Sequence, residues 1–193
     1  MNIIDLLEQE EKKRIRYRKL AKDCILFHEN DVCRNIGIII EGEVSIISYL
    51  DTGKEIIYNT LKKDEIFGNN LLFSSEPYYK GDVLADCDSL IALIGRDDLI
   101  DFMQNNRNFL KAYLKIQSDS SKNLNNRIRI LSIPSAEERF RFFMHENHNR
   151  ISYDSVERLA KKMYLSREVL QRLLGKLEKN NSIIRENKVI ILR

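Results

Sequence analysis

Side chains that can read DNA bases gather within residues 167–172. Arg167 and Arg172 can each bond guanine through two N–H groups. Glu168 can accept a hydrogen bond from cytosine, and Gln171 can pair with adenine. Four such side chains in one short stretch indicate a surface that contacts DNA bases, although the charges of an ordinary helix that is merely solvated would be a simpler explanation.

Two amphipathic helices must position these side chains. Apolar residues keep helical spacing in two runs, at Val156, Leu159, Ala160 and Met163 and at Val169, Leu170, Leu173, Leu174 and Leu177. Only Tyr164 and Leu165 separate the runs before Ser166, whose hydroxyl can accept from the first free N–H groups of the second helix. The pattern predicts a helix-turn-helix with residues 166–178 as the recognition helix. An αα-hairpin without a DNA role is the alternative.

The residues after this helix pair predict a β-hairpin. Two short apolar runs, 183–185 and 189–192, flank the polar turn 186–188. A hairpin in this place completes a winged helix. Four cations around the motif are candidates for phosphate contacts, which position a protein on DNA without specifying sequence: Lys161, Lys162, Lys176 and Arg185.

Basic charge is concentrated in the same region. The chain carries a formal net charge of +3. Residues 134–193 hold 13 Lys and Arg against 8 Asp and Glu, whereas residues 1–133 hold 19 against 21. A basic segment is the electrostatic footprint of phosphate binding, so the charge distribution agrees with the motif.

Short β-branched runs dominate the first half of the chain. They lie at 25–27, 36–40, 44–49, 56–58, 83–85 and 90–94, with turn residues between them at 41–43, 51–54 and 63–65. Strands of this length and spacing predict a β-sandwich or jelly roll. The polar opening, residues 3–20, is expected to be helical.

From Arg96 the apolar period becomes helical, and a seam at alternating spacings of four and three runs through Leu110, Leu114, Gln117, Ser121, Leu124, Ile128 and Leu131. The seam favours a dimer contact, because two-fold DNA readers need one. A helix packed on its own β-domain is the alternative. Pro134 ends this helix and Ser135 caps the next, 136–146. We therefore predict three parts: a β-domain at 1–106, a dimerisation helix at 107–133 and a DNA-binding domain at 134–193.

Composition limits the other possibilities. With 193 residues and 43% hydrophobic content, the chain can form one large or two small domains. No apolar run approaches the roughly eighteen residues of a membrane span, and the N-terminus is unlike a signal peptide, so we expect a cytoplasmic protein without a membrane partner. Cys24, Cys33 and Cys87 lack metal-site spacing and are interpreted as reduced core thiols, with no metal site expected.

The predicted order of β-roll, long helix, Pro hinge and winged helix resembles the Crp/Fnr superfamily of bacterial regulators over nearly the whole chain. The most specific part is Leu165–Arg172, which is similar to the S-R-E-x-V-x-R recognition helix of that family. The match implies that Arg167, Glu168 and Arg172 read bases. Met163 stands where the family commonly has Gly at the turn. As partners the resemblance implies double-stranded DNA and a second copy of the chain, with RNA polymerase as a further candidate.

The same resemblance identifies an altered effector cassette. Residues 64–73 are similar to the opening of the phosphate-binding cassette of the family. The Glu that holds a ribose hydroxyl is replaced by Asn69, and the Arg-Ser pair that holds the cyclic phosphate is replaced by Tyr79 and Lys80. Lys offers a single point charge where Arg offers a planar fork. The expected pocket comprises Phe67, Gly68, Asn69, Asn70, Leu71, Tyr79 and Lys80, with Leu124 and Asn125 near the adenine position. These replacements favour a small effector other than cyclic AMP, or none.

The fold class is therefore expected to be α+β, and the function that of a homodimeric, sequence-specific transcription regulator. A ligand-binding sensor that acts through a protein partner, with a vestigial DNA-binding domain, is the alternative. An enzyme is not expected, since the sequence shows no Gly-rich phosphate loop, no nucleophile–base arrangement and no paired metal ligands.

Overall fold

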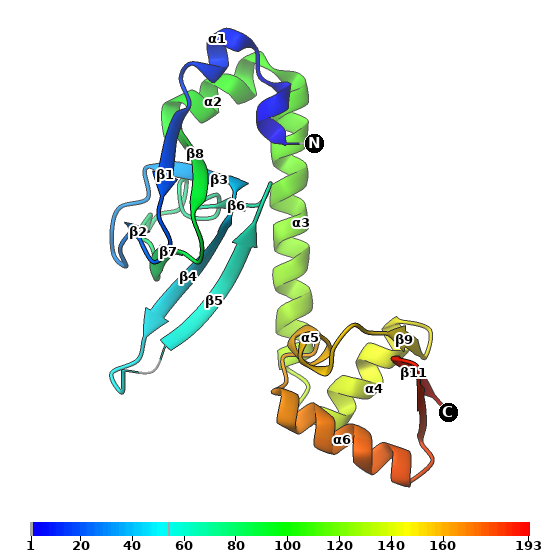
Figure 1. The fold of residues 1–193 in the computed structure, drawn as a ribbon. Helices are drawn as coiled ribbons and strands as arrows, with labels where there is room; N and C mark the ends of the chain where they lie inside the picture. The colour runs from blue at the N-terminus through cyan, green and yellow to red at the C-terminus, as the bar shows by residue number, and fades with distance from the viewer. Residues whose placement is uncertain (1, 54) are drawn as a thin grey trace. The chain divides into compact units, whose positions relative to one another are not determined.

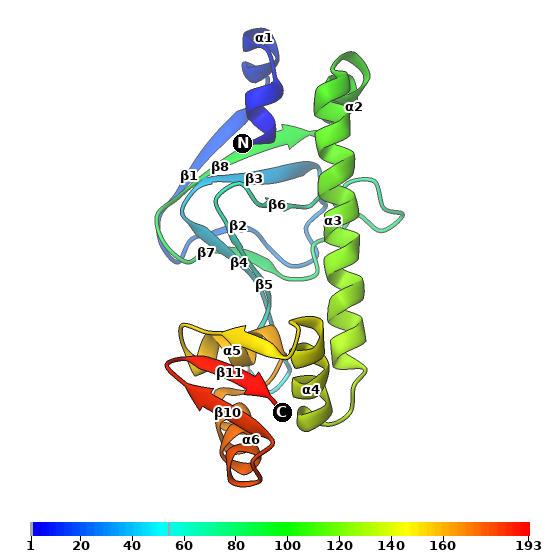
Figure 2. The same cartoon turned by 90° about the vertical axis from the view of Figure 1, so that its right-hand side faces the viewer.

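The computed structural model describes residues 2–53 and 55–193. The chain divides into two compact units, residues 1–119 and 120–193. The boundary falls within the long helix α3 (Arg107–Leu131). Figures 1 and 2 show the elements of each unit in two views. Lys54, part of the turn predicted at 51–54, lies outside the described residues.

Two four-stranded antiparallel sheets form the body of the N-terminal unit. Their strand orders are β1-β8-β3-β6 and β2-β7-β4-β5. The bounds are β1 Arg16–Leu20, β2 Ile25–Phe27, β3 Asn35–Glu41, β4 Glu43–Tyr49, β5 Glu55–Lys62, β6 Ile66–Phe67, β7 Asp82–Ala85 and β8 Ser89–Gly95. All six predicted apolar runs lie in strands, and β4 and β5 extend as a two-stranded ribbon (Figure 1).

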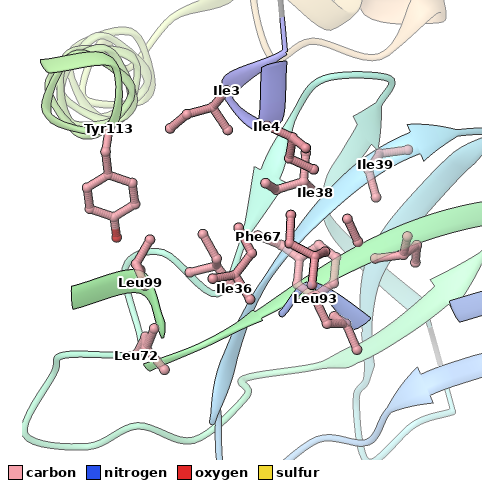
Figure 3. Close-up of a cluster of buried hydrophobic side chains, with 14 of the residues drawn as sticks. Ile3, Ile4, Ile36, Ile38, Ile39, Phe67, Leu72, Leu93, Leu99 and Tyr113 are labelled. Carbon is pink, nitrogen blue, oxygen red and sulfur yellow. The ribbon is translucent and has the colours of Figure 1, made fainter. Parts of the chain in front are cut away.

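One hydrophobic core joins the two sheets. Ile36, Ile38 and Ile91 from the first sheet and Val44 and Val83 from the second are fully buried in it. Their alternation along the strands places one face of each sheet toward the other, which is the arrangement expected of a β-roll. Figure 3 shows part of this core around Phe67.

The predicted helical opening is wrong for most of its length. A 3₁₀ helix, η1 (Ile3–Leu6), and a single helical turn, α1 (Gln9–Lys12), precede strand β1. β1 pairs along its whole length with β8, from Arg16 opposite Leu93 to Leu20 opposite Ser89. Because this pairing supplies the hydrogen bonds, the mostly exposed and charged strand needs no apolar alternation of its own.

Two helices follow the sheets, α2 (Arg96–Asn105) and α3. They are separated at Asn106, whose amide nitrogen donates to the Leu6 carbonyl at 2.8 Å while its side-chain oxygen accepts from the Phe109 N–H at 3.0 Å. Phe109 and Tyr113 of α3 are buried in the core of the N-terminal unit. Figure 3 shows Tyr113 on the same side of this core as Ile3 of η1. The first turns of α3 therefore pack on their own β-domain, as the alternative reading of this helix required.

The C-terminal unit contains three shorter helices and a three-stranded sheet. The helices are α4 (Ala136–Glu146), α5 (Val156–Lys162) and α6 (Arg167–Lys179), and the sheet order is β10-β11-β9, with β9 Arg150–Ser152, β10 Ile183–Glu186 and β11 Val189–Leu192. Ser135 caps α4 by accepting from the Glu138 N–H, as predicted. Phe140, Met144, Leu170 and Leu174 fill a core separate from that of the β-domain (Figure 2 shows the elements).

Candidate nucleic-acid interface and effector cassette

The turn between α5 and α6 is a Schellman motif. The Tyr164 N–H donates to the Lys161 carbonyl at 3.1 Å, and the Leu165 N–H donates to the Ala160 carbonyl at 3.0 Å. The residue in the left-handed region is Tyr164, with φ of 52°, and not Met163. Met163 instead is fully buried in the core. The absence of Gly at position 163 therefore does not prevent the turn.

An aromatic residue at a position that usually takes Gly requires support. The Arg127 guanidinium lies over the Tyr164 ring, 5.2 Å from its centroid, and Arg139 donates to the Tyr164 carbonyl at 3.3 Å. A cation over a ring face contributes roughly 0.5–1 kcal/mol at an exposed site. These contacts offset part of the free-energy cost of the left-handed backbone at Tyr164. They also fix the segment that leads into α6.

Helix α6 separates an apolar face from a polar one. Leu170, Leu173, Leu174 and Leu177 are buried. Arg167, Glu168, Gln171, Arg172 and Lys176 are exposed. The four predicted base readers therefore share the uncovered face of one helix, at the N-terminal end where a recognition helix contacts base edges.

Two side chains fix the beginning of this helix. The Ser166 hydroxyl accepts from the Val169 N–H at 3.2 Å, which confirms the predicted cap. Hydrogen bonds from its own backbone N–H and from the Ser166 hydroxyl lower the pKa of the Glu168 carboxyl.

Substitution Ser166→Ala is expected to lower the free energy of unfolding of the C-terminal unit by about 1 kcal/mol, since it removes the acceptor for an unpaired helix N–H group. Denaturant unfolding followed by circular dichroism measures the change. Ser120→Ala is the matched control, because Ser120 is exposed inside α3, where Ala is the better helix former. Equal losses in the two variants would contradict the capping role.

The four predicted phosphate contacts differ in how they are held. Lys176 Nζ lies 3.0 Å from Glu137 Oε2 on α4, and Lys161 Nζ lies 3.2 Å from Glu157 Oε1 on its own helix. Arg185 Nε donates to the Tyr153 hydroxyl at 2.7 Å. Lys162 is exposed and forms no ion pair within the part of the chain that the structure describes. Lys162 is thus the cation most available to a ligand.

The cassette turn is built by Gly68 and Phe67. Gly68 has φ of +76°, and a Cβ there would lie 2.8 Å from the Asn35 carbonyl oxygen. Phe67 is buried, and its ring packs across Gly37 on β3, where a Cβ would lie 2.0 Å from the ring. Gly68 therefore permits the tight turn and Phe67 packs inside the β-domain, so both residues have structural roles.

Asn69, predicted to stand in place of the ribose-binding Glu, is buried and bonded to α3. Its side-chain amide donates to Gln117 Oε1 at 2.7 Å, and Gln117 Nε2 donates back to the Asn69 carbonyl at 2.9 Å and to the Tyr113 hydroxyl at 3.0 Å. Gln117, one residue of the predicted dimer seam, therefore uses its side-chain amide for hydrogen bonds to the cassette of its own chain. Sequence reasoning missed this partner, because the two residues are 48 positions apart.

Tyr79, one of the two residues in place of the phosphate-binding pair, is buried inside the β-domain. Its ring stacks on Phe27, with centroids 4.9 Å apart. Burial and the neighbouring Cys33 sulfur raise the pKa of the Tyr79 hydroxyl. Lys80 is exposed and pairs with Glu76 at 3.8 Å. A buried phenol and a solvated ammonium do not reproduce the two-pronged donor that a cyclic phosphate requires.

The remaining predicted pocket residues belong to different elements of the chain. Asn70 is exposed and Leu71 is half-buried beside the core. Leu124 and Asn125 are exposed residues of α3 in the second compact unit. No group of three or more His, Cys, Asp or Glu side chains that could hold a metal ion occurs in residues 2–53 and 55–193.

The three thiols are free, but only one is a core residue. Cys33 is buried, and its Sγ donates to the Asn35 carbonyl at 3.4 Å, whereas Cys24 and Cys87 are exposed. The prediction of three core thiols is therefore wrong for Cys24 and Cys87, whose connections between strands lie at the surface, whereas the connection that carries Cys33 packs against the core.

Thiol labelling should distinguish these environments. Burial raises the pKa of the Cys33 thiol, so the reactive thiolate is scarcer there as well as shielded. We expect iodoacetamide to modify Cys24 and Cys87 of the native protein and to reach Cys33 only after unfolding, as peptide mass spectrometry would show. Modification of all three at one rate would contradict the buried position of Cys33.

Comparison with known proteins supports the fold. Residues 17–106 match the cyclic nucleotide-binding domain family. A CooA mutant from Carboxydothermus hydrogenoformans is similar in structure, with a TM-score of 0.66 at 18% identity over 100% of this chain and 91% of that chain. The catabolite activator protein of Thermus thermophilus gives a TM-score of 0.56 at 16% identity over 99% of this chain and 93% of that chain. The chain has the Crp/Fnr fold.

Other comparisons agree with the Crp/Fnr fold. A transcriptional regulator from Thermotoga maritima gives a TM-score of 0.60 at 23% identity, covering 69% of this chain and 100% of that chain. No curated protein sequence matches the chain. The resemblance predicted from Leu165–Arg172 and from the cassette is thus confirmed at the level of fold, and the residue roles that it implies stay predictions.

Among the described residues, none of the helices has the length and apolar content needed to cross a membrane.

Proposed function

We propose that this chain is a sequence-specific DNA-binding transcription regulator that acts as a homodimer. The observation that carries the proposal is the uncovered polar face of α6, where Arg167, Gln171 and Arg172 stand exposed beside a capped helix start. Arg and Gln at the first turns of such a helix have the donor geometry to read guanine and adenine in the major groove.

The elements around α6 support a winged helix-turn-helix. α5 and α6 meet at the Schellman turn, and the hairpin of β10 and β11 follows α6 and pairs with β9. In this arrangement the second helix enters the major groove and the first crosses the DNA backbone. We assign the DNA-binding domain to residues 134–193, the dimerisation helix to 107–133 and the effector-type domain to 1–106.

The exposed seam of α3 supports a dimer. Leu114, Leu124 and Ile128 are 54%, 58% and 54% exposed, and Leu131 is also exposed. A repeated row of large apolar side chains on a long helix is costly in water, and a second copy of the same helix would cover it. Two recognition helices related by a two-fold axis would then reach successive major grooves of a near-palindromic site.

The cassette supports regulation without cyclic AMP. The amides of Asn69 and Gln117 bond one another at the position where the family holds a ribose, and Tyr79 packs against Phe27 at the position of a phosphate-binding residue. We propose that DNA binding depends on a different small effector or on none. We also propose RNA polymerase as a further partner and the cytoplasm as the location of the protein. We do not propose an enzymatic activity.

Selection of genomic fragments by the purified protein tests this function. The selection is made at near-physiological salt, with and without cyclic AMP. We expect the same near-palindromic site to be enriched in both arms. Enrichment only with cyclic AMP would overturn the assignment of Asn69, Tyr79 and Lys80, and no enrichment in either arm would favour a sensor that acts through a protein partner.

A further inference from the structure

A basic cavity lies between α5 and the tip of the β10–β11 hairpin. Its volume is about 190 Å³, and its lining includes the cations Arg158, Lys162 and Lys188 together with Asn187 and Ser152. That volume is roughly six times the ~30 Å³ that one water occupies in the liquid. Three cations from two separate elements thus converge on one space of molecular size.

The arrangement of α5 places two of these cations on one face. Arg158 and Lys162 are four residues apart on the helix, so their side chains lie one above the other. Asp154 is the one acidic residue of the lining, and its Oδ2 accepts from Arg158 Nη1 at 3.0 Å. Both side chains of this pair are largely exposed, where such a pair contributes little, so the lining keeps an excess of positive charge.

The third cation, Lys188, lies in the turn of the β10–β11 hairpin. Asn187 and Lys188 form the turn with φ of 48° and 60°, the left-handed pair of a tight two-residue hairpin loop. The Lys188 carbonyl accepts from the Tyr153 N–H at 3.0 Å, which ties the turn to the segment just before α5. Neither Lys162 nor Lys188 has an acidic partner within residues 2–53 and 55–193. The backbone is therefore fixed while both ammonium groups are available.

We infer that this cavity binds one phosphate group of the DNA backbone, held jointly by α5 and the hairpin tip. The inference rests on the proposed DNA-binding function and adds Arg158 and Lys188 to the phosphate contacts. The first helix of the motif crosses the backbone, so cations on α5 and at the adjoining hairpin tip meet phosphate there. A tetrahedral anion can accept from several donors at once, and the neutral groups of Ser152 and Asn187 add hydrogen-bond donors.

The test is DNA affinity as a function of salt for Lys188→Gln and Lys162→Gln, with the selected site as probe. Each phosphate contact contributes about 0.9 to the slope of log affinity against log salt concentration. The proposed dimer carries two copies of the cavity, so Lys188→Gln removes two contacts and lowers the slope by about 1.8. Between 50 and 200 mM salt, wild type should therefore lose about twelvefold more affinity than Lys188→Gln. Lys111→Gln is the control, since it removes the same charge from an exposed position of α3 and should leave the slope unchanged.

A series of duplexes with a neutral methylphosphonate at the same position of both half-sites locates the contact. When the methylphosphonate replaces the bound phosphate, wild type and Lys188→Gln should bind the duplex with equal affinity. Wild type and Lys162→Gln should become equal in affinity at the same position. Two different positions would overturn the shared site.

Lysine acetylation, carried out with and without each ligand, distinguishes binding of DNA phosphate from binding of a free anion. DNA should protect Lys162 and Lys188, and inorganic phosphate at matched ionic strength should not. Protection by inorganic phosphate alone would overturn the assignment to DNA.

Wild type must first bind DNA with steep salt dependence. If it does not, both the proposed function and this inference fail. If wild type binds and Lys188→Gln behaves as Lys111→Gln does, only the phosphate site fails.

Discussion

Arg167→Ala is expected to relax the base preference at one position of each half-site and to weaken binding to the preferred sequence by about 1–3 kcal/mol per half-site. Arg167 is exposed at the first position of α6, directly after the Ser166 cap, and no acidic side chain within ion-pair distance is found for it among the described residues. Its planar donors are therefore free to bond a guanine in two places at once. Binding measurements on all four bases at each site position give the preference.

The control for this prediction is Arg18→Ala, which removes the same side chain from an exposed position of β1. It should change neither affinity nor preference by more than a few tenths of a kcal/mol. If Arg167→Ala weakened every sequence equally, Arg167 would be a phosphate contact and the assignment of base readers would be wrong.

Ile128→Asp is expected to convert the dimer into a monomer and to lower DNA affinity by roughly a hundredfold or more. The substitution would place two carboxylates opposite each other in the seam, and an uncompensated buried charge costs about 3–5 kcal/mol. Because Ile128 is more than half exposed in the single chain, the folding of the chain itself should change little. Sedimentation equilibrium measures the dimer, and titration of the selected site measures the affinity.

Asn126→Asp is the matched control, since it adds the same charge to an exposed position of α3 outside the seam. It should remain dimeric. A dimeric Ile128→Asp variant with normal DNA affinity would show that α3 pairs through another face, or that the two-fold contact lies elsewhere.

The elements that local signals specify could be predicted from sequence. The bounds of α4 and α6 follow from Ser135 and Ser166, whose hydroxyls accept the first unpaired N–H groups of each helix. β-branched runs such as residues 36–40 specify strands, and in β3 consecutive residues of this run are buried on both faces of the strand. The order of the domains followed from the change to a helical apolar period at Arg96 and from Pro134.

What escaped prediction depends on contacts distant in sequence. β1 carries Arg16, Arg18 and Lys19 and becomes a strand because β8 offers it an edge. The left-handed residue of the helix pair is Tyr164, since the buried Met163 side chain is needed in the core. Local sequence contains neither the packing of that core nor the pairing of β8.

The candidate sites show the same division. Periodicity placed Arg167, Glu168, Gln171 and Arg172 on one exposed helix face without knowledge of the fold. Periodicity could not show that the Gln117 side chain bonds Asn69 of its own chain. Nor could it show that Lys188 at the hairpin tip lines the same cavity as Lys162.

The most direct test of the central claim is the affinity of the purified protein for its selected site measured across salt concentrations, together with the symmetry of the protected sequence. We predict two half-sites about one helical turn apart, bound by two chains, with an affinity that falls steeply as salt rises. An affinity that does not depend on salt, or protection without two-fold symmetry, would contradict a DNA-binding dimer.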